Sequence, residues 1–137
     1  MNTSADMLCR ISQLFSDVHN LDQAAILDGL EEREALGSTG FGRGVAIPHC
    51  RSNQVNRPTV AILRLEQPVD CAAADGMPVT LAFGLVSPEN AGATHLHALA
   101  AISRLVRDDA MLEMLLDAPD SEALFAVLTN QILCDAA

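Results

Sequence analysis

Hydrophobic residues near the N-terminus recur every three or four positions, as they do along one face of an α-helix. Within residues 7–18 this spacing is kept by Met7, Leu8, Ile11, Leu14, Phe15 and Val18. The next stretch, NLDQAAILDGLEERE, predicts a second helix over 21–34, with Asn20 as its N-cap and Gln23 three residues further on. The chain is therefore expected to begin with two helices.

The middle of the chain has short apolar runs in place of helical periodicity. The branched run at 45–47, TVAILRL at 59–65 and VTLAFGLV at 79–86 are typical of largely buried strands. Between the last two, PVDCAAADGMP predicts a short edge strand and a turn at Asp75-Gly76. This region is therefore expected to supply the sheet.

Helical periodicity returns after Pro88. THLHALAAISRLV begins at Thr94, a suitable cap, and DDAMLEMLLD and DSEALFAVLTNQIL predict two further helices separated by Pro119. With no repeat and no long linker, the order predicts one domain over 1–137. Its class is α/β, with a single-layer mixed β-sheet flanked by α-helices on both faces.

The charge of the chain narrows the functions that it can have. The formal net charge is −10, and all eight basic residues are arginine. Nucleic acid is disfavoured as a partner, because its binding depends on clustered positive charge. The absence of lysine excludes a Walker-type phosphate loop and Schiff-base catalysis.

The sequence also bears on where the protein works. No apolar stretch reaches the length of a membrane span, and the N-terminus lacks the basic head and apolar block of a secretory signal. The four cysteines form no CxxC pair, which is typical of reduced, mostly buried thiols: Cys9, Cys50, Cys71 and Cys134. We therefore expect a cytoplasmic protein without direct membrane insertion.

The segment STGFGRGVAIPHC, residues 38–50, is the first candidate site. Its three glycines permit positive φ, and successive N–H groups in such a loop can bind an anion, although a plain turn has the same composition. Pro48 favours an extended residue before it and so delivers His49 from a stiff backbone at a strand end. For His49 alone, a structural and a catalytic role are both open.

Two further residues are candidates to join His49. On a helical wheel, His95 falls within the apolar arc of its helix and should face inward, whereas His97 falls opposite and should face solvent. Arg33, near the end of the second helix, either pairs with a neighbouring glutamate or directs its guanidinium fork towards a phosphate. The spacing alone leaves these alternatives open.

Three stretches together resemble a known family: REALGSTGFGRGVAIPH, PVDCAAADGMPVTLAFGLVSPE and THLHALAAISRLVRD. They are similar to the enzyme IIA domains of the phosphoenolpyruvate:sugar phosphotransferase system, in the fructose/mannitol superfamily and closest to its nitrogen-regulatory branch. The resemblance covers about residues 7–131. It implies a mixed sheet flanked by helices.

The resemblance also implies a role for each candidate. His49, in the AIPH motif, corresponds to the phosphoryl acceptor, Arg33 to an arginine that neutralises the phosphate, and His95 to a histidine beside the acceptor. Ser38 and Thr39 match the ST of the motif and are expected to donate hydrogen bonds near the phosphate. The chemistry requires no metal, nucleotide or other cofactor.

The implied partners are a histidine phosphocarrier protein as phosphoryl donor and, downstream, regulatory target proteins. A sugar-specific IIA component that passes phosphate to a IIB component remains an alternative, as does a binding module that is never phosphorylated. A zinc hydrolase using His49, His95 and a cysteine is a further alternative. The spacing of His95 and His97 suits a metal on a strand, where both side chains point the same way, but on a helix residues two apart diverge.

The sequence departs from the family in three places. Cys50 follows His49 where glycine is frequent, and Arg43 lies in the glycine loop, where it either adds to the anion site or lies in solvent. Family members commonly have a strand ahead of the first helix, so we expect either a truncated start or a lost edge strand. Self-association as a homodimer stays open.

Overall fold

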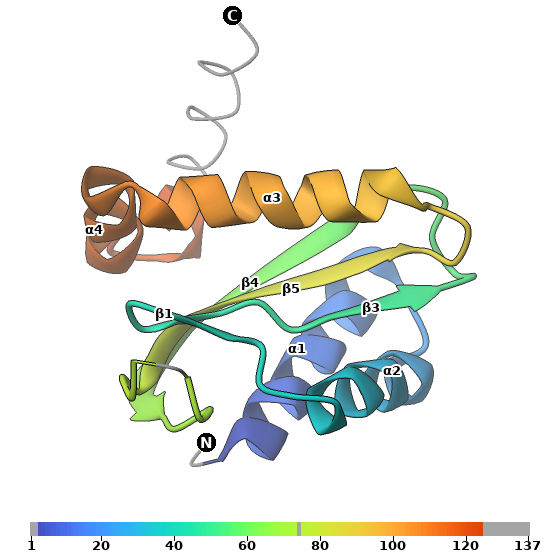
Figure 1. Ribbon diagram of the computed structural model, residues 1–137, viewed down its shortest axis with the longest axis horizontal. Coiled ribbons are helices and arrows are strands. Elements are labelled where there is room, and N and C mark those ends of the chain that lie inside the picture. The colour runs from blue at the N-terminus through green and yellow to red at the C-terminus, as the bar shows by residue number, and fades with distance from the viewer. Residues whose placement is uncertain (1–2, 74, 125–137) are drawn as a thin grey trace, which may run out of the picture. The chain divides into compact units, whose positions relative to one another are not determined.

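The computed structural model describes residues 3–73 and 75–124. Its internal contacts divide the chain into two compact units, Met1–Ala101 and Ile102–Ala137, which are described separately. The helices are α1 (Ser4–His19), α2 (Gln23–Ala35), α3 (Ala93–Arg107) and α4 (Asp109–Asp117). The strands are β1 (Gly40–Gly42), β2 (Val45–Ala46), β3 (His49–Ser52), β4 (Thr59–Val69) and β5 (Val79–Pro88) (Figure 1).

The two N-terminal helices form as predicted, but the cap between them differs. Thr3 caps α1 by accepting the Asp6 N–H, and Asp22 caps α2 by accepting the Ala24 N–H. Asn20 has left-handed φ and ψ angles and ends α1. The prediction of Asn20 as the N-cap of the second helix is therefore wrong, because Asp22 lies next to the first helical residue.

The sheet is mixed, as predicted, and β5 is its central strand. It pairs in parallel with β2 and β3 along one edge and antiparallel with β4 along the other, while β1 pairs with β2. The edge strand expected at the start of 68–78 does not form as a separate strand. Its first two residues, Pro68 and Val69, end β4, which lies at an edge of the sheet, and Val69 pairs with Val79. The described residues of 70–78 form no strand, although Asp75-Gly76 makes the expected turn.

A proline separates β2 from β3. Val45 pairs with Leu81 and His49 with Leu85, so the two strands keep one register along β5. Pro48 lies in the gap, where it has no N–H to donate, and its carbonyl accepts the Leu85 N–H at 2.9 Å. The extended approach to His49 that the sequence predicts is present, and His49 is the first residue of the strand that follows.

The glycine-rich stretch forms the β1–β2 hairpin. Its turn residues, Arg43 and Gly44, both have positive φ, at 61° and 80°, as the right-handed twist of a two-residue hairpin turn requires. The Asp75 carboxylate accepts the Arg43 N–H at 2.8 Å and the Met77 N–H at 3.0 Å. This contact ties the hairpin turn to the β4–β5 connection.

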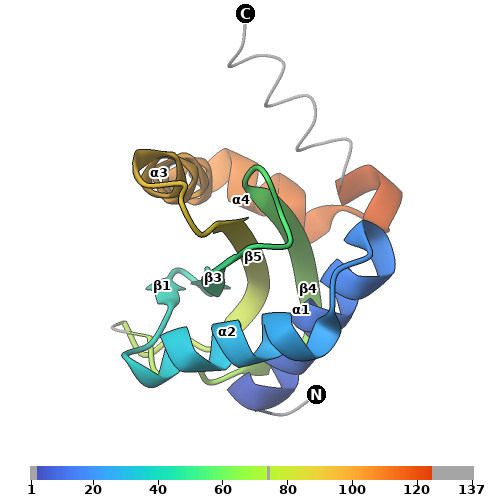
Figure 2. The same ribbon diagram turned by 90° about the vertical axis from the view of Figure 1, so that its right-hand side faces the viewer.

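Helices α1 and α2 pack on one face of the sheet. Gly84 on β5 permits this close approach, because a Cβ there would lie 2.5 Å from Cγ2 of Ile11 and 3.0 Å from Cε2 of Phe15. The first turns of α3, residues 93–101, lie on the opposite face (Figure 2). The prediction of an α/β fold with a mixed sheet and helices on both faces is thereby confirmed.

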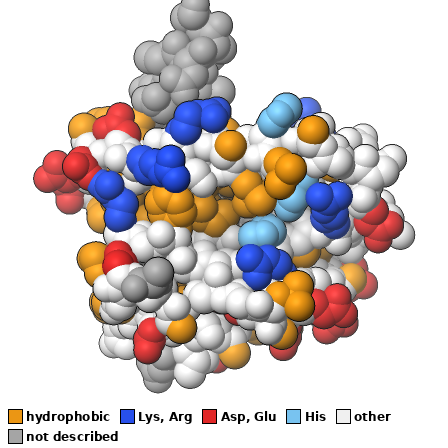
Figure 3. Space-filling model, in the orientation of Figure 1, with side chains coloured by type: hydrophobic (Ala, Val, Ile, Leu, Met, Phe, Trp, Pro, Cys, Tyr) orange, Lys and Arg blue, Asp and Glu red, His pale blue; other side chains and the backbone are white. Residues whose placement is uncertain are grey.

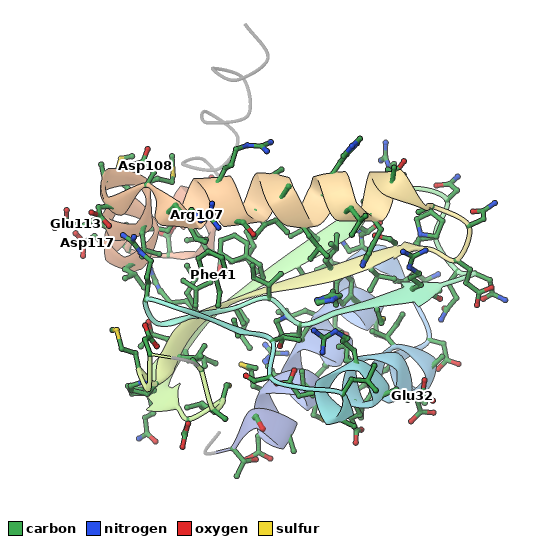
Figure 4. The ribbon with its side chains drawn as sticks, in the orientation of Figure 1. Glu32, Phe41, Arg107, Asp108, Glu113 and Asp117 are labelled. Atoms are coloured by element: carbon green, nitrogen blue, oxygen red, sulfur yellow. The ribbon has the colours of Figure 1, made fainter. Side chains whose placement is uncertain are left out.

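The second unit contains the end of α3 and all of α4. Asp108 caps α4 by accepting the N–H groups of Ala110 and Met111 at the helix start (Figure 4). Of the last predicted helix, residues 121–124 are helical and the remainder lies outside the described residues. Within the described residues, no helix combines the length and the apolar composition that crossing a bilayer requires.

Candidate functional site

The alternation of side chains along β3 gives its two faces different surroundings. Cys50 joins the buried cluster formed with α1 and α2, and a Cβ on Gly29 of α2 would lie 3.1 Å from its Sγ. We call this side of the sheet the α1 face. His49 therefore projects from the other side, where it neighbours Leu85 and remains half-buried. We call that side the histidine face.

The two ring nitrogens of His49 have different partners. Nδ1 lies 2.7 Å from the Ile47 carbonyl oxygen, and Nε of Arg33 donates to Nε2 at 3.2 Å. A guanidinium only donates and a carbonyl only accepts, so these partners assign the proton to Nδ1 and a lone pair to Nε2. The half-buried ring thus has its lone pair on Nε2, where it accepts a hydrogen bond from a cation.

The surroundings of His49 favour its neutral form. Burial has the largest effect on the pKa of His49 and lowers it from its usual 6.5. The hydrogen bond to the Ile47 carbonyl raises this pKa, the Arg33 guanidinium lowers it, and the Glu34 carboxylate raises it. Because the net direction is downward, the ring is mostly neutral at pH 7. A neutral imidazole is the form that can act as a nucleophile.

His95 lies next to His49 on the histidine face. The two ring centroids are 5.5 Å apart with the planes tilted by 50°, and Nδ1 of His95 lies 2.7 Å from Oγ of Ser87. His95 is 6% exposed and His97 is exposed, so the predicted inward and outward directions are confirmed. Burial, followed by the charges of Arg51 and His49, lowers the pKa of His95 below its usual value.

Arg33 reaches His49 from the last turn of α2. Its Nη1 donates to the Gly37 carbonyl at 2.9 Å while Nε donates to His49, so the guanidinium is held at two points. The preceding residue, Glu32, points away from the sheet (Figure 4). The guanidinium is therefore turned towards His49, and its contact with a phosphate stays a prediction.

The surface around these groups is partly apolar. Leu36, which follows α2, is 84% exposed, and Leu96, next to His95, is 62% exposed. In the space-filling view, histidine side chains lie beside arginine and hydrophobic ones (Figure 3). In this acidic chain, such a surface is suited to an anionic group presented by another molecule.

Ser38 and Thr39 hold the loop that precedes β1. The Ser38 hydroxyl donates to the Cys71 carbonyl and accepts the Gly40 N–H, while the Thr39 hydroxyl donates to the Glu34 carboxylate at 2.6 Å. The Thr39 carbonyl accepts the Ile47 N–H, which fixes the approach to His49. Both hydroxyl protons are engaged here, and the contact of these residues with phosphate stays a prediction.

Glu34 and Ser87 contribute to the site without having been selected from the sequence. From the sequence, Glu34 is only a glutamate next to Arg33; in the structure it accepts both the N–H and the hydroxyl of Thr39. Ser87 lies at the end of β5, one residue beyond the predicted strand. Strand alternation is the sequence signal that could have identified Ser87. Because Ser87 is two residues beyond Leu85, it lies on the same face of the sheet, which is the histidine face.

The zinc-hydrolase alternative lacks a third ligand in the described part of the chain. Cys50 lies on the α1 face, opposite His49, and burial raises the pKa of its thiol to about 11. Across residues 3–73 and 75–124, no three His, Cys, Asp or Glu side chains are grouped to hold a metal ion. The described cysteines are free, with Cys50 and Cys71 buried and Cys9 exposed; Cys134 lies outside the described residues.

Comparison with known proteins found a matching family and similar relatives. Residues 1–131 match the family described as "Phosphoenolpyruvate-dependent sugar phosphotransferase system, EIIA 2". A nitrogen regulatory protein of Bradyrhizobium diazoefficiens is 37% identical over 128 residues, covering 93% of this chain and 84% of the relative.

Solved structures agree at the level of the fold. The crystal structure of nitrogen regulatory protein IIA-Ntr from Neisseria meningitidis has a TM-score of 0.85 and 35% identity, covering 93% of this chain and 88% of that one. The mannitol enzyme IIA of Escherichia coli, solved in complex with phosphorylated enzyme IIB, has a TM-score of 0.76 at 14% identity. That match covers 95% of this chain and 90% of the other, and it shows the fold alone.

The family model matches most of the chain, and the match covers more than two thirds of the relative of 37% identity. This chain belongs to the EIIA type 2 family of the phosphoenolpyruvate-dependent sugar phosphotransferase system.

Proposed function

We propose that this protein is a cytoplasmic phosphocarrier that accepts a phosphoryl group on Nε2 of His49 from the phosphohistidine of a small histidine phosphocarrier protein. The observation that carries the proposal is the hydrogen bond from Arg33 Nε to His49 Nε2, since it shows that Nε2 has the lone pair and places beside it a cation of the kind that binds phosphate. The family match supports it independently.

The transfer step needs no metal or nucleotide. The lone pair of His49 Nε2 attacks phosphorus, the Nε2–P bond forms as the N–P bond of the donor breaks, and the bonding electron pair returns to the donor ring. His49 keeps its Nδ1 proton, so its ring becomes positively charged. The Ile47 carbonyl, 2.7 Å from Nδ1, stabilises that charge.

Arg33 changes partner during the reaction. In the free protein its Nε occupies the lone pair of His49, and it must release this nitrogen before attack. The arriving phosphoryl oxygens carry more negative charge than an imidazole nitrogen, so they are the stronger acceptors. Arg33 is therefore positioned to stabilise both the transition state and the phosphorylated product.

We further propose that the phosphorylation state of His49 controls binding to regulatory target proteins in nitrogen-related regulation. The similarity to nitrogen regulatory proteins supports this role. The second candidate is a sugar-type IIA component that donates to a IIB component; it is favoured by the fold shared with the mannitol enzyme IIA, which was solved with its phosphorylated IIB partner.

One reconstituted assay tests the proposal. The full chain is incubated with phosphoenolpyruvate, the first enzyme of the system and its histidine phosphocarrier, then measured by intact-mass spectrometry. We expect an acid-labile gain of one phosphate that is lost in His49→Ala. An unchanged wild-type mass with active cognate donors would leave the non-phosphorylated binding module as the better description.

Pull-downs with and without phosphorylation, probing for target proteins and for a IIB component, distinguish the two downstream roles.

A further inference from the structure

Ser87 is a buried polar residue that the transfer step described above does not use. It lies near the end of β5, is 0% exposed, and places its Oγ 2.7 Å from Nδ1 of His95. Alternation along β5 puts its side chain on the histidine face, two residues beyond Leu85. Burying a hydroxyl costs free energy unless it forms a hydrogen bond, so its contact with this candidate catalytic ring needs a physical explanation.

The direction of this hydrogen bond follows from counting protons. A buried hydroxyl has one proton and needs an acceptor for it, and in the described part of the chain Nδ1 of His95 is the partner of the Ser87 hydroxyl. His95 is mostly neutral at pH 7, since burial and the charges of Arg51 and His49 disfavour its protonation. A neutral imidazole carries a single N–H. If Ser87 donates to Nδ1, that N–H must be at Nε2.

The tautomer decides what His95 can do. Both nitrogens of His49 already have partners, in Ile47 and Arg33, so an N–H on Nε2 of His95 is not needed to orient that ring. A phosphoryl group on His49 instead presents anionic oxygens, which an N–H stabilises and a nitrogen lone pair repels.

We propose that Ser87 is a positioning residue that holds His95 in the Nε2–H tautomer, so that His95 donates a hydrogen bond to the phosphoryl group transferred to His49. This inference rests on the proposed phosphoryl transfer to His49. It assigns to Ser87 a role that acts through His95, without contact between Ser87 and the phosphate.

The tautomer can be measured without any phosphoryl transfer. In the full-length, ¹⁵N-labelled, unphosphorylated protein at pH 7.5, long-range ¹H–¹⁵N spectra distinguish a protonated ring nitrogen from an unprotonated one. We expect His95 to be protonated at Nε2 in the wild type and to become a mixture of tautomers in Ser87→Ala. A wild-type ring protonated at Nδ1, or an unchanged spectrum in Ser87→Ala, would overturn the proposal.

The matched control is a second buried serine away from the site. Ser12 on α1 is also 0% exposed, and its hydroxyl donates to the Cys9 carbonyl at 2.7 Å. Ser12→Ala removes a buried hydroxyl of the same kind, so it should leave the His95 tautomer and the transfer rate unchanged. Ser87→Thr keeps a hydroxyl at the site and should retain the wild-type tautomer.

A double-mutant cycle separates positioning from a general structural effect. Ser87→Ala should slow phosphorylation of His49 about 5- to 20-fold. In a His95→Gln background it should have less than about a twofold effect, because the glutamine NH2 always carries its protons and has no tautomer to select. Equal slowing in both backgrounds would make Ser87 a structural residue and refute its positioning role.

The two proposals fail in different ways. If the wild type accepts no phosphate from cognate donors, phosphoryl transfer to His49 is rejected and the inference about donation to phosphate is rejected with it, whatever the tautomer. If the wild type is phosphorylated but the tautomer does not depend on Ser87, only the inference about Ser87 is rejected.

Discussion

The two faces of the sheet at β3 and β5 contain side chains of opposite character only one residue apart. On the α1 face, Cys50 is packed against α2, and burial raises the pKa of its thiol to about 11. On the histidine face, His49 is half-buried, has a polar partner at each nitrogen and has a lowered pKa. The difference shows how strand alternation gives one neighbour an apolar, buried environment and the other a polar, partly exposed one.

This comparison separates changes that affect chemistry from changes that affect stability. Substitutions on the histidine face should alter phosphoryl transfer while leaving the fold largely intact. Substitutions on the α1 face should alter the free energy of unfolding while leaving the transfer chemistry of the folded protein largely intact.

The largest effect is expected for His49→Ala. The nucleophile is removed, so the rate of phosphoryl acceptance should fall by at least about 10³-fold. Intact-mass spectrometry and single-turnover transfer with phosphorylated donor measure the loss. Because His49 is only half-buried, the urea midpoint should change little. Retention of an acid-labile phosphate in this variant would place the acceptor elsewhere.

Loss of the Arg33 guanidinium should have the next largest effect. Arg33→Ala should slow transfer by about 10²- to 10³-fold, the typical cost of losing one oriented donor to a developing anion. Arg33→Lys should recover only part of the rate, because an ammonium lacks the planar fork. Arg57→Ala, which removes an exposed arginine elsewhere, is the charge-matched control. Similar transfer rates for the Arg57 and Arg33 variants would mean that Arg33 contributes only its positive charge to the net charge of the protein, and not an oriented hydrogen bond.

On the α1 face, Gly84→Ala should disturb folding more than chemistry. Its Cβ would lie 2.5 Å from Cγ2 of Ile11 and 3.0 Å from Cε2 of Phe15, so both packed side chains must shift. We expect the free energy of unfolding to fall by about 1–3 kcal/mol, as measured by urea denaturation. The folded fraction should still be phosphorylated on His49. An unchanged stability would mean that α1 does not pack closely on β5.

The pH dependence sharpens the comparison for His49 itself. Since its pKa lies below 6.5 in the folded state, more than half of the rings are neutral at pH 6.5, and transfer should exceed half of its plateau rate there. Arg33→Ala removes a cation and should move the NMR-titrated pKa of His49 upward. A pKa of His49 above 6.5 in the wild type would contradict the expected lowering of this pKa by burial.

The same shift predicts how acid affects stability. The unfolded chain takes up a proton on His49 at a higher pH than the folded chain, so stability decreases as pH falls through about 6.5 towards the folded-state pKa. His49→Gln should make urea midpoints between pH 7.5 and 5.5 less sensitive to acid than those of the wild type.

The smallest effect is expected for Cys50→Ala. The substitution removes one buried sulfur from the α1 face and should cost about 1 kcal/mol of stability. The rate of transfer to His49 should remain within about twofold of the wild type, since the thiol faces away from the imidazole. A loss of activity comparable with that of Arg33→Ala would mean that the two faces are not independent.

Several features could be predicted from the sequence because they depend on neighbours along the chain. Helical spacing placed His95 inward and His97 outward, and Pro48 implied the extended approach to His49. The apolar runs located the long strands β4 and β5. The shorter strands β1 and β3 were missed, because Gly40–Gly42 and His49–Ser52 have no apolar run and become strands only by pairing with β2 and β5.

Other features depend on residues that are distant in sequence. Arg33 and His49 are 16 positions apart, so their hydrogen bond, and with it the lone pair on Nε2, exists only once α2 packs against β3. Ser87 and His95 are brought together by the passage from β5 into α3, and the Ser38 hydroxyl finds its acceptor 33 positions away, at Cys71. Local patterns thus determined which residues are candidates for chemistry. The tertiary structure decided which nitrogen of His49 has the lone pair, because hydrogen-bond partners are determined by proximity in space.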